Sequence, residues 1–444
     1  MRQPSVRGTR DFYPDDMAMR RWLTGCWRTV SRRAGFVEVD GPELEPLELY
    51  TGKSGDEIVE QIYWLEDKSG RRLALRPEFT PTLARMVAAR QASLPEPIRW
   101  FNVSRCFRYE RAQKGRQREF FQWNVDLLGL EGEIADAECI SVAVDSLREL
   151  GLTPADAEVL ISDRRLTSAL LAHLDIPNDR VESIFAVLDK RDKVPPEALA
   201  EMLVQAGLDT RQREGIERIL SWRSLSDIDR RELETPEVRL AVEATERLFG
   251  HLADYGIADW CRFDIGIVRG LAYYTGPVWE VHDRKGELRA VFGGGRYDRL
   301  LADLGGKPMP ACGFGCGDVV LGILLGERGL APETEAAADC YVISNTRDWA
   351  QVLQVVNFFR KSLRLRTQFD MSQAGFNRQH KNAVQSGARF KAIVGKQPWP
   401  GIEIIDAKPP DGGAPATHSF DLLRAGPLEV DNLRKALGLS GGLA

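Results

Sequence analysis

Residues 98–128 hold the densest group of side chains that could bind an anion. Four cations, Arg111, Lys114, Arg116 and Arg118, fall within eight residues between two runs of alternating apolar and polar side chains. The planar guanidinium group can hold a phosphate through two parallel hydrogen bonds. The cluster is therefore either a phosphate-binding turn or an ordinary solvated basic turn.

The run that follows this turn carries different side chains on its two faces, because side chains alternate along a strand. One face has Phe121, Trp123, Val125 and Leu127, and the other has Phe120, Gln122, Asn124 and Asp126. On the preceding run, Arg108 and Glu110 share a face. In the middle of a sheet, the polar face would need partners, because unpaired buried polar groups are costly. A ligand site would supply them, whereas an edge hairpin would leave that face in water.

Arg269 is a lone arginine between apolar flanks, followed closely by Tyr273 and Tyr274. A buried arginine needs an anionic partner, and tyrosine hydroxyl groups can orient a small polar ligand. The alternative is a structural ion pair with aromatic packing around it.

Two further segments contain residue types that could bind a ligand. Three glycines, 293–295, precede Arg296, Tyr297 and Asp298, and they would let a ligand approach the backbone closely. The segment matches neither the dinucleotide-binding glycine motif nor the P-loop. Glu78 and Thr80 precede a helix expected from about residue 82, where they could bind an ammonium group or cap the helix.

These side chains need a scaffold of mixed helix and strand. Periodicity and turn residues predict helices over 15–34 and 135–150, short strands over 62–65 and 72–75, and a β-hairpin over 98–128. Residues 165–255 have helical patterns without strand runs, and 262–325 return to strands and glycines. After a linker over 328–338, alternating strands and helices predict a separate α/β domain.

Composition narrows the class of protein. The 444 residues carry 60 Lys and Arg against 65 Asp and Glu, a net charge of −5, which excludes a uniformly basic nucleic-acid coat. Residues 337–444 hold 14 basic and nine acidic side chains, so this part is mildly basic. There is no apolar run of membrane-spanning length and no secretory signal pattern. Seven scattered cysteines and distant histidines predict reduced thiols in the cytoplasm and no structural metal site.

Taken in this order, the segments closely resemble those of histidyl-tRNA synthetases, a family of class II aminoacyl-tRNA synthetases. The resemblance covers nearly the whole chain and is carried by residues 7–11, 35–46, 107–116, 269–274, 293–298 and 379–390. The segment around Pro42 resembles the class's dimer-forming first motif, which implies a homodimer.

The resemblance implies an α+β fold. Its catalytic core would be a class II antiparallel sheet of six or more strands flanked by helices, built from residues 1–164 and 256–327. Residues 165–255 would form a helical insertion, and 337–444 an anticodon-binding-like α/β domain.

The resemblance also implies a two-step reaction. The carboxylate of L-histidine attacks the α-phosphate of ATP and releases pyrophosphate, and the adenylate then passes its acyl group to the 3′ end of tRNA(His). Such chemistry normally uses Mg²⁺, whose ligands the sequence does not reveal. The first step needs positioning and charge stabilisation rather than a general base, because the attacking carboxylate is already ionised.

Residue roles follow by motif match. Arg108 and Arg269 would flank the α-phosphate as catalytic groups, Arg116 would bind the outer phosphates, Phe120 would stack on adenine, and Glu110 would belong to the ATP site. Glu78, Thr80 and Gln122 would hold the amino end of histidine. Asp126 and Tyr274 would bind the imidazole nitrogens, with Tyr273 and Tyr297 completing the pocket. Arg111 and Gln113 would meet the tRNA acceptor end.

The sequence departs from the family pattern at several positions. Val320 stands where the third motif usually has an arginine that clamps ATP, and the next cation along the chain is Arg328. Asp126 replaces a common Glu, Asn124 a common Gly, and Ala272 a common Asp. Two alternatives to an active ligase follow: a regulatory subunit of ATP phosphoribosyltransferase, which is a non-catalytic paralogue, or a tRNA-binding sensor.

Overall fold

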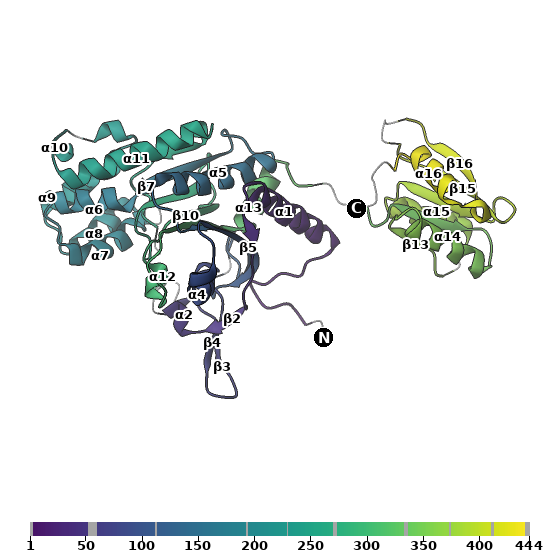
Figure 1. Ribbon diagram of the computed structural model, residues 1–444, viewed down its shortest axis with the longest axis horizontal. Coiled ribbons are helices and arrows are strands. Elements are labelled where there is room, and N and C mark those ends of the chain that lie inside the picture. The colour runs from purple at the N-terminus through teal and green to yellow at the C-terminus, as the bar shows by residue number, and fades with distance from the viewer. Residues whose placement is uncertain are drawn as a thin grey trace. The chain divides into compact units, whose positions relative to one another are not determined.

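The computed structural model describes residues 3–51, 60–111, 113–191, 194–228, 230–269, 273–332, 336–372, 374–409 and 413–439. The chain forms two compact units, Met1–Pro332 and Glu333–Ala444 (Figure 1). The departure of Ala272 lies outside the described residues.

The first unit is built on an eight-stranded sheet with the order β1-β5-β6-β11-β10-β9-β7-β8. Its strands are β1 (Val37–Glu38), β5 (Ile98–Phe107), β6 (Glu119–Leu128), β7 (Ala157–Asp163), β8 (Cys261–Phe263), β9 (Pro277–Asp283), β10 (Phe292–Arg296) and β11 (Ala311–Gly317). The pairs from β5 to β7 are antiparallel, and β1 and β8 join the edges in parallel. This matches the expected class II core.

The hairpin of β5 and β6 confirms the prediction for residues 98–128. Strand β6 lies between β5 and β11, so it is not an edge strand. Trp123 on its apolar face stacks on Trp27, with 5.8 Å between the ring centroids. Its other face holds Gln122, Asn124 and Asp126, all buried. The polar residues predicted from the alternation are therefore inside the protein, where they need partners.

Helices cover both faces of this sheet (Figure 1). Helices α1 (Pro14–Arg33), α5 (Glu133–Glu149) and α13 (Asp318–Glu327) bury their apolar sides against the Trp123 face. Helices α4 (Thr80–Arg90) and α12 (Leu300–Asp303) pack on the opposite face, beside Tyr273, Tyr274 and Tyr297. A small sheet of β2 (Leu44–Pro46), β4 (Arg72–Leu75) and β3 (Trp64–Glu66) lies near α2 (Glu48–Thr51), and η1 (Gln91–Ser93) extends α4.

A cluster of helices interrupts the sheet strands between β7 and β8, as the patterns of residues 165–255 predicted. It comprises α6 (Arg164–His173), α7 (Asn178–Leu188), α8 (Pro196–Gln205), α9 (Thr210–Ser221), η3 (Leu225–Asp227), α10 (Arg230–Leu233) and α11 (Pro236–Asp254), and η4 (Ala258–Trp260) leads into β8. The cluster has its own apolar core, which also includes Phe263 and Ile265 after it.

The second unit is a five-stranded sheet with helices, as the alternating pattern predicted. The sheet has the order β13 (Thr367–Phe369), β12 (Cys340–Ser344), β14 (Phe390–Val394), β15 (Gly401–Asp406) and β16 (Ala416–Asp421). Helices α14 (Trp349–Lys361), α15 (Phe376–Gln385) and α16 (Pro427–Ala436), with η5 (Leu422–Arg424), complete it. No described helix of either unit has the length and apolarity needed to cross a membrane.

Candidate active site

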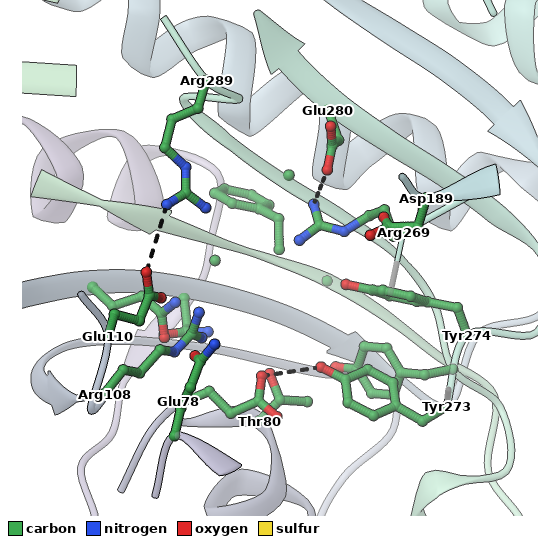
Figure 2. Close-up of a pocket in the computed structure, with 18 of the residues that line it drawn as sticks. Glu78, Thr80, Arg108, Glu110, Asp189, Arg269, Tyr273, Tyr274, Glu280 and Arg289 are labelled. Carbon is green, nitrogen blue, oxygen red and sulfur yellow. Dashed lines mark hydrogen bonds and ion pairs between the residues drawn. The ribbon is translucent and has the colours of Figure 1, made fainter. Parts of the chain in front are cut away.

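A polar cavity opens on the sheet face that carries Gln122. Its walls are formed by Gln61, Glu78, Thr80, Arg108, Glu110, Arg116, Gln122, Asn124, Asp189, Arg269, Tyr273, Tyr274, Glu280, Arg289, Tyr297 and Phe314, over the glycines 293, 313 and 315. A second hollow shares Arg108, Arg116, Arg269 and Arg289 with it and adds Phe120 and Val320. Figure 2 shows the arginine and tyrosine side chains facing one another across this space.

The glycines of β10 and β11 keep the floor of the cavity open. A methyl group on Gly293 would collide with the Arg269 guanidinium, and one on Gly313 would lie 2.6 Å from Oδ1 of Asp126. A methyl group on Gly315 would lie 2.9 Å from Nε2 of Gln122. The glycine-rich segments therefore make room for polar side chains of the neighbouring strands, besides allowing a ligand to approach.

The end of the cavity beside α4 holds the groups predicted to bind an ammonium group. Glu78 is 4% exposed, and the Tyr273 hydroxyl donates to its Oε2 across 3.3 Å. Thr80 is the first residue of α4, and Gln122 faces the same space from β6. A buried carboxylate with a polar wall suits a cation that brings its own hydrogen-bond donors.

Asp126 lies behind this wall, not among the side chains that line it. Its carboxylate is buried, and Oδ1 accepts a short hydrogen bond from the Tyr297 hydroxyl. Oδ2 is buried and has no hydrogen-bond partner among the described residues. Burial raises the pKa of Asp126 to about 7, although the Tyr297 hydrogen bond lowers it. An unpaired buried acceptor is costly, and Tyr297, which lines the cavity, connects Asp126 to it.

The two arginines predicted to flank a phosphate lie on opposite sides of the cavity. Arg108 donates from Nε to the carbonyl of Pro77 (2.9 Å), and its guanidinium is 5.4 Å from the centre of the Phe120 ring. The Arg269 guanidinium donates to the carbonyl of Trp279 (3.3 Å) and lies 3.9 Å from Glu280. Both arginines line the cavity and direct their guanidinium groups into it (Figure 2).

Arg269 has a left-handed backbone, with φ of 50°. This conformation is uncommon for a residue with a branched or long side chain and is often found at functional sites. Burial lowers the pKa of Arg269, but the neighbouring Tyr274 and Glu280 outweigh that effect and the net shift is upward. The guanidinium therefore stays fully charged in a mostly buried position.

Arg116 and Glu110 pair at the other end of the cavity. Nε of Arg116 is 3.0 Å from Oε2 of Glu110, and Arg289 approaches the same oxygen at 3.9 Å. Phe120, predicted to stack on adenine, lines the same hollow as Arg116 and Val320. The structure thus brings the predicted phosphate-binding and base-binding residues to one hollow.

The two residues predicted to meet the tRNA acceptor end lie outside the two hollows that contain Arg269. Gln113 forms a backbone bridge with Arg116 in the β5–β6 turn and lines a different hollow, beside Arg10 and Asp318. Arg111 is exposed and lines neither of the two hollows that contain Arg269.

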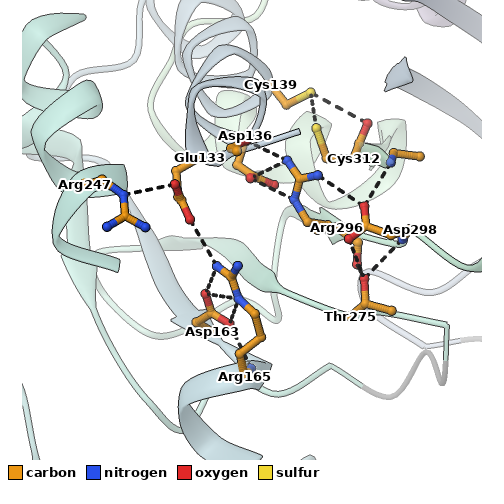
Figure 3. Close-up of polar contacts among 12 residues, drawn as sticks. Glu133, Asp136, Cys139, Asp163, Arg165, Arg247, Thr275, Arg296, Asp298 and Cys312 are labelled. Atoms are coloured by element: carbon orange, nitrogen blue, oxygen red, sulfur yellow. Dashed lines mark hydrogen bonds and ion pairs between the residues drawn. The ribbon is translucent and has the colours of Figure 1, made fainter. Parts of the chain in front are cut away.

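Arg296, from the glycine-rich motif, has a structural position instead (Figure 3). Its guanidinium donates to Asp136 (2.7 and 3.0 Å), to Asp298 (3.1 Å) and to the carbonyl of Gly132 (2.9 Å). Burial raises the pKa of Asp136 to about 7, and Arg296 opposes that shift. This network fixes the end of β10 and so positions the adjacent Tyr297.

Sequence reasoning missed four polar residues of the cavity: Gln61, Asp189, Glu280 and Arg289. Asp189 follows α7 in the helical cluster, and Arg289 lies in the β9–β10 connection. Neither belongs to a motif, so only their position in space identifies them. Among the described residues, no group of three or more His, Cys, Asp or Glu side chains could hold a metal ion.

Comparison with known proteins agrees with this geometry. Residues 8–317 match the family "Histidyl-tRNA synthetase". The chain is 41% identical over 395 residues to the histidine–tRNA ligase of Opitutus terrae, covering 88% of this chain and 90% of the relative. It is 38% identical to the chloroplastic/mitochondrial histidine–tRNA ligase of Arabidopsis thaliana, covering 88% and 80%.

A solved histidyl-tRNA synthetase from Nostoc sp. PCC 7120 has the same fold, with a TM-score of 0.77, 21% identity, and coverage of 98% of this chain and 99% of that one. A Bacillus halodurans protein described as an ATP phosphoribosyltransferase regulatory subunit/histidyl-tRNA synthetase shares the fold at a TM-score of 0.71 and 23% identity, over 89% of this chain and 99% of that one. On sequence and fold together, the chain belongs to the histidyl-tRNA synthetase family.

Proposed function

We propose that the protein is an active histidine–tRNA ligase. The observation that carries this proposal is one cavity that joins a buried polar pocket, lined by Glu78, Gln122 and Tyr297, to an arginine-rich hollow with Phe120. A pocket for an amino acid and a site for a nucleoside triphosphate must meet if a carboxylate is to attack a phosphorus atom.

Histidine would enter with its ammonium group beside Glu78, Thr80 and Gln122. Oδ2 of Asp126 would accept from one imidazole nitrogen, and the Tyr274 hydroxyl would bind the other, with Tyr273 and Tyr297 closing the pocket. Apolar amino acids would be rejected, because they would leave these buried polar groups unpaired.

ATP would lie with its adenine on Phe120 and its α-phosphate between Arg108 and Arg269. Glu110 would remain in the ATP site, and Arg116 would turn to the outer phosphates. The histidine carboxylate oxygen then bonds to the α-phosphorus as the bond to pyrophosphate breaks. The two flanking guanidinium groups stabilise the charge that grows on the phosphoryl oxygens.

Mg²⁺ would neutralise the triphosphate and the departing pyrophosphate. It commonly binds one or two carboxylates together with phosphate oxygens and waters. Glu110 and Glu280 are the carboxylates that line the hollow at this end, so they fit this role.

In the second step, the terminal ribose hydroxyl of tRNA(His) would attack the carbonyl carbon of the adenylate and AMP would leave. Arg111 and Gln113 would meet the acceptor end. We also propose a homodimer through the segment around Pro42, and a cytoplasmic location.

The alternative of a non-catalytic regulatory subunit is not favoured, because the relatives at about 40% identity are histidine–tRNA ligases. ATP–pyrophosphate exchange that requires histidine tests the proposal directly. Exchange in the native protein and its loss in Arg269→Ala would support the ligase. Folded protein that binds histidine but does not catalyse exchange would contradict it.

A further inference from the structure

Arg289 is placed where the usual arginine of the third motif is missing. Val320 lies in the first turn of α13 and lines the hollow that contains Phe120, Arg116 and Arg289. A methyl group added to Gly115 would lie 3.3 Å from Cγ2 of Val320 and 3.6 Å from Cδ of Arg289. Both side chains therefore flank the same turn and line the same hollow.

The backbone that carries Arg289 is anchored. The connection from β9 to β10 is held by Asp283, whose carboxylate accepts from the backbone N–H groups of Glu287 (3.2 Å) and Leu288 (3.0 Å). Leu288 also packs against the main apolar core. The fold thus fixes where the Arg289 side chain starts, while its end remains 44% exposed at the hollow.

The charges around Arg289 favour an anionic ligand. Burial and, next, the positive charge of Arg116 lower its pKa, and Arg108 adds to this effect. Three guanidinium groups that face one hollow repel one another unless an anion lies between them. Glu110 supplies one negative charge, but Arg116 already holds it at 3.0 Å and Arg289 is 3.9 Å away.

A purely structural ion pair with Glu110 explains this geometry poorly. At 3.9 Å the contact is too long for a hydrogen bond, and an ion pair whose arginine is 44% exposed contributes little to stability. In Figure 2, Arg289 reaches into the cavity from the side opposite Arg108 and Glu110. An arginine on the open side of a phosphate site can close around a ligand that brings several anionic oxygens.

We propose that Arg289 binds the outer phosphates of ATP and replaces the third-motif arginine that Val320 lacks. The inference rests on the proposed function for the identity of the anion as a nucleoside triphosphate. It makes Arg289 a substrate-binding residue supplied by the β9–β10 connection instead of by helix α13.

The test is Arg289→Ala, with Arg284→Ala as the matched control. Arg284 lies in the same connection but donates outward, to Glu158 and the carbonyl of Pro154. We expect the Kd for a non-hydrolysable ATP analogue, measured by calorimetry with Mg²⁺, to rise about 10- to 100-fold in Arg289→Ala. The Kd for histidine and the unfolding midpoint should stay close to native values, and Arg284→Ala should bind the analogue normally.

A rescue experiment separates replacement from a general charge effect. In Arg289→Ala/Val320→Arg the new side chain can enter the space left by the Arg289 stem, so analogue binding should recover. Val320→Arg alone crowds the existing arginine and should give no gain. A Kd in Arg289→Ala within about twofold of native overturns the proposal, and so does failure of the folded double variant to regain affinity.

This outcome is separable from the fate of the proposed function. If the native protein catalyses histidine-dependent exchange and Arg289→Ala has an unchanged KM for ATP, the proposed ligase function is supported and the role of Arg289 is contradicted. If the analogue binds in an Arg289-dependent way but exchange does not require histidine, the role of Arg289 is supported and the ligase function is contradicted.

Discussion

Arginines of the first unit differ in what their guanidinium groups contact. The structural group is represented by Arg296, whose guanidinium donates to Asp136, Asp298 and a backbone carbonyl at 2.7–3.1 Å. The cavity group comprises Arg108, Arg116, Arg269 and Arg289, where the carboxylate contacts of Arg269 and Arg289 are 3.9 Å long.

This difference shows how a motif arginine can be assigned a role. A buried guanidinium whose donors all have partners holds elements together, since breaking one partner leaves an uncompensated charge. A guanidinium that keeps donors directed into a cavity is arranged for a ligand. Motif match gave Arg269 a role at the α-phosphate and gave Arg296 none, and the two guanidinium groups also differ in their partners in the structure.

The largest expected effect is on stability in the structural group. Arg296→Ala leaves Asp136 buried without its cation, and we expect the free energy of unfolding to fall by about 3–5 kcal/mol. Urea unfolding followed by circular dichroism measures this. Arg289→Ala, at a half-exposed position, should change it by less than about 0.5 kcal/mol. Equal losses in both variants would remove the distinction between the two groups.

The next effect is on catalysis in the cavity group. Arg269→Ala should lower kcat for histidine-dependent exchange about 100- to 1,000-fold, because the guanidinium stabilises charge that grows in the transition state. The matched control is Arg262→Ala, an arginine of β8 that pairs with Glu158 instead of facing the cavity. A rate in Arg269→Ala close to that of the control would contradict the catalytic role.

A smaller effect is expected from the buried carboxylate of the histidine pocket. The pKa of Asp126 is about 7 in the folded protein and near its ordinary value of about 3.9 when unfolded. At pH values between these two pKa values, the folded state binds a proton on Asp126 that the unfolded state has released. The stabilisation that this proton gives to the folded state is therefore complete at low pH and is lost as the pH rises through about 7. Between about pH 5 and about pH 8 the native protein should lose about 2.5 kcal/mol that Asp126→Asn does not lose.

Unfolding in urea at both pH values compares the two proteins, and Tyr297→Phe serves as a second variant. The Tyr297 hydroxyl lowers the pKa of Asp126, so its removal should move the loss of stability to higher pH. Identical pH profiles for native protein and Asp126→Asn would mean that Asp126 titrates normally. Asp126→Asn should also weaken histidine binding, because Oδ2 loses its charge.

The smallest effect is expected at Arg111. Arg111→Ala should leave exchange unchanged and weaken tRNA binding, with the slope of log K against log salt reduced by about one, as for the loss of one phosphate contact. Filter binding over a range of salt concentrations measures it. Arg33→Ala, at the end of α1 on the other side of the sheet, should keep the native slope. A slope in Arg111→Ala equal to that of the control would remove Arg111 from the tRNA surface.

Local pattern was enough to predict the strands that carry the site. Alternation along residues 119–128 placed Gln122, Asn124 and Asp126 on one face, and the structure has them buried on that face. Strand β3 begins two residues later than the expected strand over 62–65, at Trp64. Element ends depend on capping and packing contacts, which periodicity does not contain.

Roles that depend on distant neighbours were harder to predict. The sequence did not determine whether the polar face of β6 contacts solvent or a ligand. The pairing of β6 with β11, some 190 residues later in the chain, makes β6 an internal strand and buries that face. The next cation along the chain after Val320 is Arg328, and the sequence offered only Arg116 and Arg118 of the β5–β6 turn as possible substitutes for the absent arginine. Arg289 precedes Val320 by 31 residues and meets the same turn only because β10 and β11 are neighbours.

The sequence by itself determined the secondary structure, the alternation of polar and apolar faces, and the family, because these follow from residue order over short spans and from motif spacing. The tertiary structure decided which arginines are paired and which face a cavity, and it placed Asp126 behind Tyr297 with one oxygen unpaired. Those properties depend on which strands become neighbours, and burial and charge act across that distance in space.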